Sequence, residues 1–258
     1  MYQTILYKVE KRRAWITLNR PEKRNALNGL MIEELTEVLR LSAKDDKVKV
    51  IALKANGPAF SAGADLAYLQ QMQDNTYKEN LADSRALMQL LKCIYQHPKL
   101  VIAMLEGHAI AGGCGLATVC DYSFAVPAAK LGYSETRIGF IPAIVMTFLV
   151  RKIGEGYARD LLLSARLIDA EEALKKGLIN AVFEADEILH KANAFMDDII
   201  ENNSAESIKR TKQLLVDVQN ISFNEALSLA SEQNAAMRST ADCHKGIDAF
   251  LKKEKPTW

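Results

Sequence analysis

Two short stretches of small residues could present backbone N–H groups to a substrate. Residues 61–66 read Ser-Ala-Gly-Ala-Asp-Leu, and residues 111–116 read Ala-Gly-Gly-Cys-Gly-Leu. Each stretch precedes a segment with helical character, and the N-terminus of a helix carries unpaired N–H groups and the positive end of the helix dipole. Small side chains let a ligand reach the main chain. Both stretches therefore suit an oxyanion hole built from peptide N–H groups.

Glu135 is the candidate acid or base. It lies in residues 132–139, a short polar interruption between apolar segments. A carboxylate held among Tyr133, Ile138 and Phe140 would be desolvated enough to transfer a proton near neutral pH. The ordinary alternative is a solvated glutamate at a helix start, paired with Arg137.

Other catalytic motifs do not occur at these turns. The dinucleotide fingerprint G-x-G-x-x-G and the phosphate loop G-x-x-x-x-G-K-[ST] are both missing. There is no G-x-S-x-G, and of four histidines only His108 sits beside a glycine turn, where a packed strand-end residue is the simpler interpretation. The four cysteines form no C-x-x-C pair, which disfavours structural zinc and fits reduced thiols in a cytoplasmic compartment.

Composition indicates a folded, soluble protein. The 258 residues are 49% hydrophobic and 25% charged, enough to bury a substantial core. The formal net charge of +1 creates no global field for nucleic acid or an anionic membrane, so basic residues at 8–13 and 209–212 are interpreted as solvated faces. The longest apolar run, residues 138–150, contains Gly139 and Pro142 and is shorter than the roughly 20 residues of a membrane-spanning helix. No export signal is visible at the N-terminus.

Periodicity predicts an α/β protein with a mostly parallel sheet wrapped by helices. Beyond Pro142 the pattern is almost wholly helical, and a change to polar residues places the likeliest boundary near residue 190 without a flexible linker. The expected strands are residues 2–10, 14–19, 48–54, 100–105, 122–126 and 130–132. The expected helices before Pro142 are residues 28–45, a stretch reaching residue 72, residues 80–96, and a small-residue helix ending at residue 120.

The two glycine stretches, their order and their spacing to Glu135 together resemble the crotonase superfamily, the enoyl-CoA hydratase/isomerase family. Residues 18–28 resemble its N-terminal signature, and the match covers nearly the whole chain. The resemblance implies a crotonase-like spiral of ββα units over residues 1–190. It implies a helical region, residues 191–258, for oligomerisation and active-site cover, in a homotrimer or homohexamer. The implied substrate is an acyl-coenzyme A thioester, with no metal or redox cofactor.

The resemblance also assigns roles to individual positions. The backbone N–H groups of Ala64 and Gly112 would hold the thioester oxygen, with Glu135 as acid and base. Positions that usually contact coenzyme A are Arg24, Ala26, Ala62, Asp65 and Leu66. Phe250 and Lys253 resemble residues that reach the nucleotide part, often of a neighbouring subunit, although for Lys253 a solvated tail is an equal alternative.

Gly115 departs from the pattern of hydratases with two glutamates, which carry the second glutamate at this substrate-site position. Moving a double bond can use one carboxylate as a shuttle, so Gly115 favours an isomerase. Residues 135–143 instead resemble a hydratase subgroup for branched or carboxylated enoyl-CoAs, such as methylglutaconyl-CoA, where this glycine is familiar. We predict hydration of a 2-enoyl-CoA, with Δ3,Δ2-enoyl-CoA isomerisation and non-catalytic acyl-CoA binding as alternatives. Residues 143–146 lack the family's glycine cluster, which predicts an acyl pocket wall that is bulkier or differently shaped.

Overall fold

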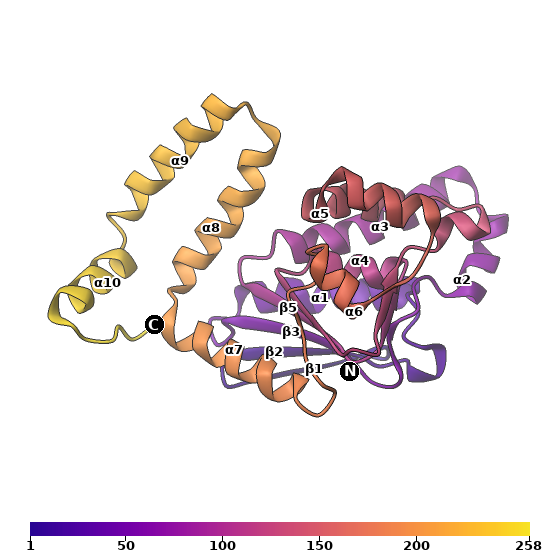
Figure 1. Ribbon diagram of the computed structural model, residues 1–258, viewed down its shortest axis with the longest axis horizontal. Helices are drawn as coiled ribbons and strands as arrows, with labels where there is room; N and C mark the ends of the chain where they lie inside the picture. Colours follow the sequence, from indigo (N-terminus) through magenta and orange to yellow (C-terminus); the bar gives the residue numbers. More distant parts are fainter.

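The computed structural model describes residues 1–258, and its largest element is a six-stranded sheet (Figure 1). All neighbours in this sheet run parallel except β1 and β2, which form a hairpin. Lys11 and Arg12 close that hairpin with positive φ angles of 47° and 60°. The strands in spatial order are β1 (Ile5–Glu10), β2 (Arg13–Leu18), β3 (Val50–Ala55), β5 (Leu100–Leu105), β7 (Tyr122–Ala125) and β10 (Ala181–Val182).

A second, four-stranded sheet contains β4 (Ala59–Ser61), β6 (His108–Ile110), β8 (Lys130–Gly132) and β9 (Ile168–Asp169), in that spatial order. The first three strands are parallel, and β9 runs antiparallel to β8. Neighbouring parallel strands end at the same edge of a sheet, so the segments that leave β4, β6 and β8 start close together. The sequence predicted β8 but not β4 or β6, because three residues are too few for a periodicity signal.

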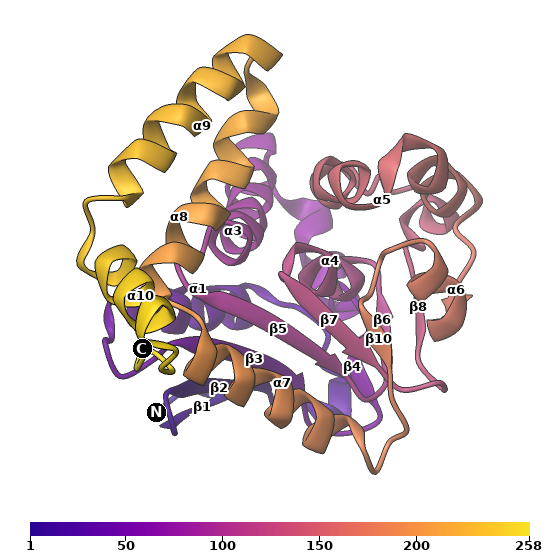
Figure 2. The ribbon, with the colours of Figure 1, turned by 60° about the vertical axis from the view of Figure 1, so that its left-hand side comes forward.

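The helices start where the sequence supplies caps. Asn28 accepts a hydrogen bond from the N–H of Met31 at the start of α1, and Thr76 forms a capping box with Glu79 at the start of α3. In Figure 2, α4 lies above β5 and β7 and α7 lies below them. The helices are α1 (Gly29–Lys44), α2 (Leu66–Gln71), α3 (Tyr77–Tyr95), α4 (Gly112–Val119), α5 (Ala143–Ser164), α6 (Ala170–Lys175), α7 (Ile188–Asn202), α8 (Ala205–Asp217), α9 (Phe223–Met237) and α10 (Ala241–Lys252).

Most predicted elements are confirmed to within a few residues, with two additions after Pro142. The short strands β9 and β10 interrupt the helical C-terminal third. Residue 190 lies inside α7, which buries Ile188, Ala192, Met196 and Ile200. The helices α9 and α10 then extend at one end of the molecule (Figure 1), whereas α8 is joined to the body, since Lys212 donates to the carbonyl of Lys99 (2.9 Å) and pairs with Asp121.

The interpretation of residues 8–13 and 209–212 as solvated basic faces is wrong for Arg13 and Lys212, which are buried in ion pairs. Arg13 pairs with Asp197 and Lys212 pairs with Asp121. Neither guanidinium nor ammonium group faces solvent as a free cation. No helix has both the length and the apolar character that crossing a membrane would require.

Candidate active site

The second sheet brings the three predicted catalytic positions to one edge. Ala64 follows the end of β4 by three residues, Gly112 follows the end of β6 by two, and Glu135 follows the end of β8 by three. Because β6 pairs with both β4 and β8 in parallel, all three positions leave the sheet on the same side. Segments separated by some 70 residues of sequence therefore meet at one place.

The peptide of Ala64 is held by a short bridge to the loop before α1. The N–H of Leu27 donates to the carbonyl of Gly63 (2.7 Å), and the N–H of Asp65 donates to the carbonyl of Leu27 (2.9 Å). The N–H of Ala64 lies between these two bonds and has no partner of its own in the chain. Ala64 is also exposed. It therefore offers a fixed, free donor to a ligand.

Gly112 supplies the second donor because it is the first residue of α4. The helical hydrogen bonds begin only when the N–H of Gly115 reaches the carbonyl of Ala111 (2.9 Å), so the N–H of Gly112 lies outside the helix ladder. Ala111 adopts φ 50° and ψ −123°, a strained backbone conformation for a residue with a side chain. A bond from its N–H to the carbonyl of Gly132 (2.8 Å) fixes this turn.

The two glycine stretches touch one another. Gly63 has a φ of +90°, and a Cβ placed there would lie 2.8 Å from the Cβ of Ala111 and 3.5 Å from the backbone nitrogen of Gly112. A Cβ on Gly113 would lie 2.5 Å from the carbonyl oxygen of Ser61. Only glycine permits this approach, which sets the peptides of Ala64 and Gly112 beside each other.

Glu135 is the first residue of the short 3₁₀ helix η3 (Glu135–Ile138) and is half-buried. Its Oε2 atom is buried and has no hydrogen-bond partner. Burial raises the pKa of Glu135 above its usual value, since the charged form loses its water. The alternative pairing with Arg137 does not occur, because Glu135 forms no ion pair. The carboxyl group is thus poised to exchange protons.

A buried polar chain ties the Glu135 segment to α4. Tyr133, two residues before Glu135, is fully buried, and its hydroxyl lies 2.7 Å from Oγ1 of Thr118. Thr118 in turn donates to the carbonyl of Cys114 (2.9 Å). Burial raises the pKa of Tyr133 well above its usual value and that of Cys114 to about 11, so both groups stay protonated. The Tyr133–Thr118 contact joins the segment before Glu135 to α4, and Cys114 is not a thiolate nucleophile.

The predicted coenzyme A positions near the N-terminus line up along the first glycine stretch. The carbonyl of Arg24 accepts a hydrogen bond from the N–H of Ala62 (2.9 Å), so the two segments run side by side. Arg24, Ala62 and Leu66 are exposed, whereas Ala26 is buried. These backbone contacts bring the predicted positions to the same side of the site as Ala64.

Asp65 is placed as a structural residue rather than a free side chain. Its carboxylate accepts a hydrogen bond from Arg20 Nη2 (2.9 Å) and caps α2 through the N–H of Ala67 (3.0 Å). Arg20 also donates to the carbonyl of Ala26 (2.7 Å), so one guanidinium joins both segments beside the site. Arg20 lies within the signature of residues 18–28, but the sequence alone assigned it no role. The only available signal was its place in that signature.

Phe250 and Lys253 are not brought to the site within one chain. Phe250 lies on α10 and Lys253 directly follows it, and both are exposed. Figure 1 shows α10 at the opposite end of the molecule from α2. Any contact of these residues with a ligand at Ala64 would have to come from another copy of the chain.

Gly115 lies in the first turn of α4 and is buried against apolar residues. A Cβ at this position would be 2.5 Å from Cγ1 of Val145 and 3.9 Å from Cδ1 of Leu91. No carboxylate is present there, so Glu135 is the acidic side chain that the three strand ends bring to the site.

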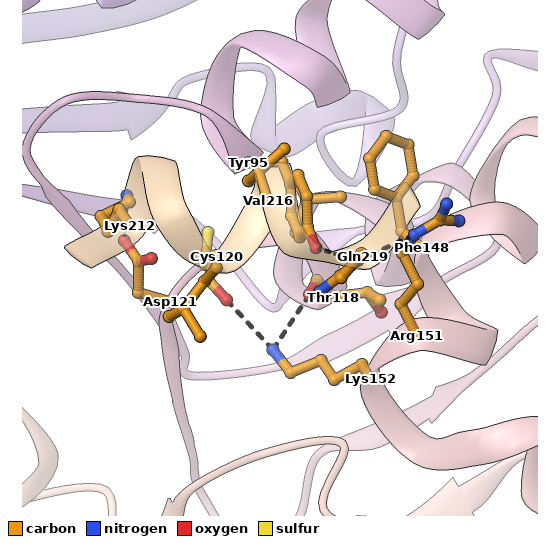
Figure 3. Close-up of a pocket in the computed structure, with 12 residues that line it drawn as sticks. Tyr95, Thr118, Cys120, Asp121, Phe148, Arg151, Lys152, Lys212, Val216 and Gln219 are labelled. Atoms are coloured by element: carbon orange, nitrogen blue, oxygen red, sulfur yellow. Dashed lines mark hydrogen bonds and ion pairs between the residues drawn. The ribbon is translucent and has the colours of Figure 1, made fainter. Parts of the chain in front are cut away.

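A separate cavity of about 210 Å³ lies at the C-terminal end of α4, away from the free N–H groups (Figure 3). Its cations are already bonded. Lys152 donates to the carbonyls of Thr118 (3.0 Å) and Cys120 (3.1 Å), while Lys212 pairs with Asp121. These lysines bond to Thr118 and Cys120 at the end of α4 and to the following Asp121, whereas the third cation of the cavity, Arg151, hydrogen-bonds Gln219 (2.9 Å) and Asn220 (3.1 Å) and has no carboxylate partner. No cluster of His, Cys, Asp or Glu side chains is arranged to hold a metal ion.

Comparison with known proteins gives one consistent result. The family model described as Enoyl-CoA hydratase/isomerase matches residues 10–258. A Thermus thermophilus protein provisionally named an enoyl-CoA hydratase is 39% identical over 94% of this chain and 96% of its own. The 2,3-dehydroadipyl-CoA hydratase of Escherichia coli is 32% identical over 93% of this chain and 92% of its own. The crystal structure of an enoyl-CoA hydratase from Shewanella pealeana matches with a TM-score of 0.94 and 30% identity, covering 100% of this chain and 96% of that one.

Proposed function

The chain belongs to the enoyl-CoA hydratase/isomerase family, and from this premise we propose that it catalyses the reversible hydration of a 2-enoyl-CoA with Glu135 as acid and base. One observation carries the proposal. Three parallel strands end at one edge and bring a desolvated, unpartnered carboxylate to the free N–H groups of Ala64 and Gly112.

The mechanism follows from where charge develops. Glu135 takes a proton from water as the water oxygen bonds to C3 of the enoyl group, and the electron pair of the C2=C3 bond moves toward the thioester oxygen. The N–H groups of Ala64 and Gly112 stabilise this enolate oxygen more than the ground-state carbonyl. Protonated Glu135 then returns its proton to C2, giving the 3-hydroxyacyl thioester. One such N–H donor typically contributes about 10²–10³ in rate.

The raised pKa of Glu135 suits both halves of this cycle. A higher pKa makes the Glu135 carboxylate a better base toward water than an ordinary glutamate, and it brings the pKa closer to the neutral pH at which both protonation states are used. The hydration rate should therefore fall on the acid side at a pH above the usual glutamate range, where Glu135 becomes protonated.

The test is a substrate panel of crotonyl-CoA, methylglutaconyl-CoA and a 3-enoyl-CoA, with the products identified by mass. We expect hydration of at least one 2-enoyl-CoA. Glu135→Gln should lower turnover by about 10²–10⁴, the usual contribution of a general acid or base. Glu171→Gln is the matched control, since Glu171 is exposed on α6 and makes no ion pair. A Glu135→Gln variant with unchanged turnover would refute the assignment.

Isomerisation is the second candidate, and one specific observation favours it. The wall of Val145 and Leu91 against Gly115 provides no second group to orient water. A single carboxylate could then move a proton between C4 and C2 of a 3-enoyl-CoA. Conversion of the 3-enoyl-CoA without hydration would favour this reaction, and saturable binding of thioesters without any turnover would favour a non-catalytic acyl-CoA-binding protein.

For the acyl group, we propose a branched or carboxylated 2-enoyl-CoA of the methylglutaconyl type. Two facts support this choice, namely the likeness of residues 135–143 to that hydratase subgroup and the name of the Escherichia coli relative, whose substrate carries a second carboxyl group. The same panel tests it through the ratio of kcat/KM for methylglutaconyl-CoA to that for crotonyl-CoA.

We also propose that the protein assembles as a homotrimer or homohexamer through its C-terminal helices. The apolar side chains of Phe223, Phe250 and Leu251 are 77%, 82% and 73% exposed on α9 and α10. Helices that expose such apolar side chains are typical of an interface between protein subunits. A neighbouring copy would also bring Phe250 and Lys253 to a site from which they are remote within one chain.

A further inference from the structure

The contact between Gly115 and Val145 restricts what the site can contain. A Cβ on Gly115 would lie 2.5 Å from Cγ1 and 3.5 Å from Cβ of Val145. Real Cβ atoms do not come so close to another carbon, so something would have to move. Val145 is in the first turn of α5 and only 4% exposed. Its branched side chain is confined to one main rotamer in a helix, so Cγ1 cannot turn aside.

Val145 occupies the space into which a side chain at position 115 would extend. In hydratases with two glutamates, the second glutamate occupies this position, so its Cβ would point where Val145 lies here. In this structure the space next to Gly115 is filled by Cγ1 of Val145 from α5, with Cδ1 of Leu91 from α3 also within 4 Å of where a Cβ would lie. The loss of a second acid is therefore built into the packing of α4 against α5, as well as into the identity of residue 115.

We propose that Val145 is a specificity-determining residue, which excludes a second carboxylate and thereby sets the balance between hydration and double-bond migration. This inference rests on the proposed function. Hydration places OH on C3 and H on C2 and needs an oriented water, whereas migration only moves a proton between C4 and C2. An apolar wall beside the reacting carbons leaves Glu135 as the one group that can hold that water, which slows hydration relative to proton transfer at carbon.

The first experiment tests the contact without using activity. Thermal midpoints are measured for Gly115→Ala, Val145→Ala and the double variant. Each single change should lower the midpoint, the first by crowding and the second by leaving a cavity. The double variant should unfold close to Val145→Ala, because the cavity accepts the added methyl. Additive losses in the double variant would overturn the steric claim.

The second experiment tests the balance of reactions. Gly115→Glu alone should lose at least tenfold in turnover and unfold at a lower temperature. Gly115→Glu/Val145→Gly should recover turnover and raise the ratio of hydration to 3-enoyl-CoA isomerisation at least tenfold over the unmodified protein. The matched control is Gly115→Gln/Val145→Gly, which has the same shape without the carboxylate and should leave the ratio low.

Each outcome is decisive. A Gly115→Glu single variant that is as stable and active as the double would show that Val145 blocks nothing. Equal ratios in the carboxylate and amide double variants would overturn the role of Val145 in specificity. If the unmodified protein converts none of the substrates, the proposed function and the specificity role both fail. The thermal midpoints of the Gly115→Ala and Val145→Ala variants still test whether residues 115 and 145 are in steric contact.

Discussion

The environment of Glu135, the proposed acid and base, should lower the stability of the fold at neutral pH. The pKa of this carboxyl group is raised in the folded chain, so the folded state binds this proton more tightly than the unfolded state does. The group contributes most at pH below its ordinary pKa of 4.5, and that contribution is lost as pH rises through the higher folded value. At neutral pH the ionised, half-buried carboxylate with an unpartnered oxygen therefore destabilises the fold.

We expect Glu135→Gln to raise the thermal midpoint at pH 7 while removing activity. The gain should shrink as pH falls below about 5, because protonated glutamate and glutamine are then alike. Thermal denaturation across a pH series measures this, and the exposed Glu171→Gln should show no such dependence. A variant that is less stable than the parent at pH 7 would argue against desolvation as the cause.

Arg20 is a residue whose structural role the sequence did not predict. The side chains of Arg20 and Asp65 are only 15% and 10% exposed, and together they join residues on both sides of Ala64. We expect Arg20→Met to cost about 3–5 kcal/mol, the range for a buried charge that loses its partner, and to lower kcat more than it raises KM. Arg20→Lys should retain more stability than Arg20→Met. Equal denaturation midpoints for Arg20→Met and the parent would rule out this bracing role.

Among individual residues, the sequence identified those that belong to local patterns. Local composition picked out the two glycine stretches and the polar interruption around Glu135, whereas the choice of Ala64, Gly112 and Glu135 for individual roles came from the resemblance to the crotonase superfamily. The contributions of Tyr133 and of the strained Ala111 depend on partners far along the chain, Thr118 and Gly132 respectively. No local pattern could have predicted those contacts.

At the scale of elements, the site depends on how closely β4 approaches α4. A Cβ on Gly113 would lie 2.5 Å from the carbonyl oxygen of Ser61, so the separation of the two segments is set by the absence of a side chain. We expect Gly113→Ala to destabilise the protein by about 1–3 kcal/mol through overpacking and to reduce turnover, because the N–H groups of Ala64 and Gly112 move apart.

Gly156→Ala is the matched control for that variant. Gly156 lies in α5, where an added Cβ would meet nothing within 4 Å. Replacing a helical glycine by alanine at an open position should stabilise by up to about 1 kcal/mol. Denaturant unfolding and turnover of the two variants should therefore move in opposite directions, and a harmless Gly113→Ala would show that the close approach is not required.

The sequence predicted the four helices before Pro142 and the longer strands because their apolar positions repeat over many residues, and after Pro142 it predicted helical structure without the bounds of each helix. It missed β4 and β6, although these strands with β8 form the edge on which the site is built. Their pairing is a property of the whole fold, and three residues carry too little pattern to indicate it. The crotonase-type fold expected from the resemblance is confirmed by the match to solved structures.

At the scale of the whole molecule, His97 makes the fold sensitive to acid. Its buried ring contacts the carbonyl of Leu39 (3.0 Å) and accepts a hydrogen bond from the N–H of Lys99 (3.1 Å). Burial lowers the pKa of His97 to about 4. The unfolded chain therefore takes up this proton first, so stability is intact above about pH 6.5 and is lost as pH falls toward 4.

The expected outcome is a falling denaturation midpoint between pH 6.5 and 4. His97→Gln keeps an amide that can reach the same backbone groups and should flatten this part of the profile. The comparison uses the difference between the two midpoints at each pH, which cancels the other titrating groups. An unchanged slope in His97→Gln would assign the acid sensitivity to other residues.

The exposed apolar side chains of α9 and α10 predict that copies of the chain associate in solution. If a second copy covers these helices, Phe250→Ser should shift the mass measured by sedimentation toward a single chain and raise KM for the acyl-CoA. Lys209→Ser, an exposed change on α8, serves as the control. A parent protein that sediments as a single chain would contradict the proposed assembly.

The convergence of three strand ends affects how the enzyme folds. Ala64, Gly112 and Glu135 follow three separate parallel strands whose pairing closes long loops, and such non-local contacts form slowly. No fragment ending before β8 can hold all three groups. Recovery of turnover during refolding should therefore lag behind the return of helical signal, because activity requires all three strands to be paired.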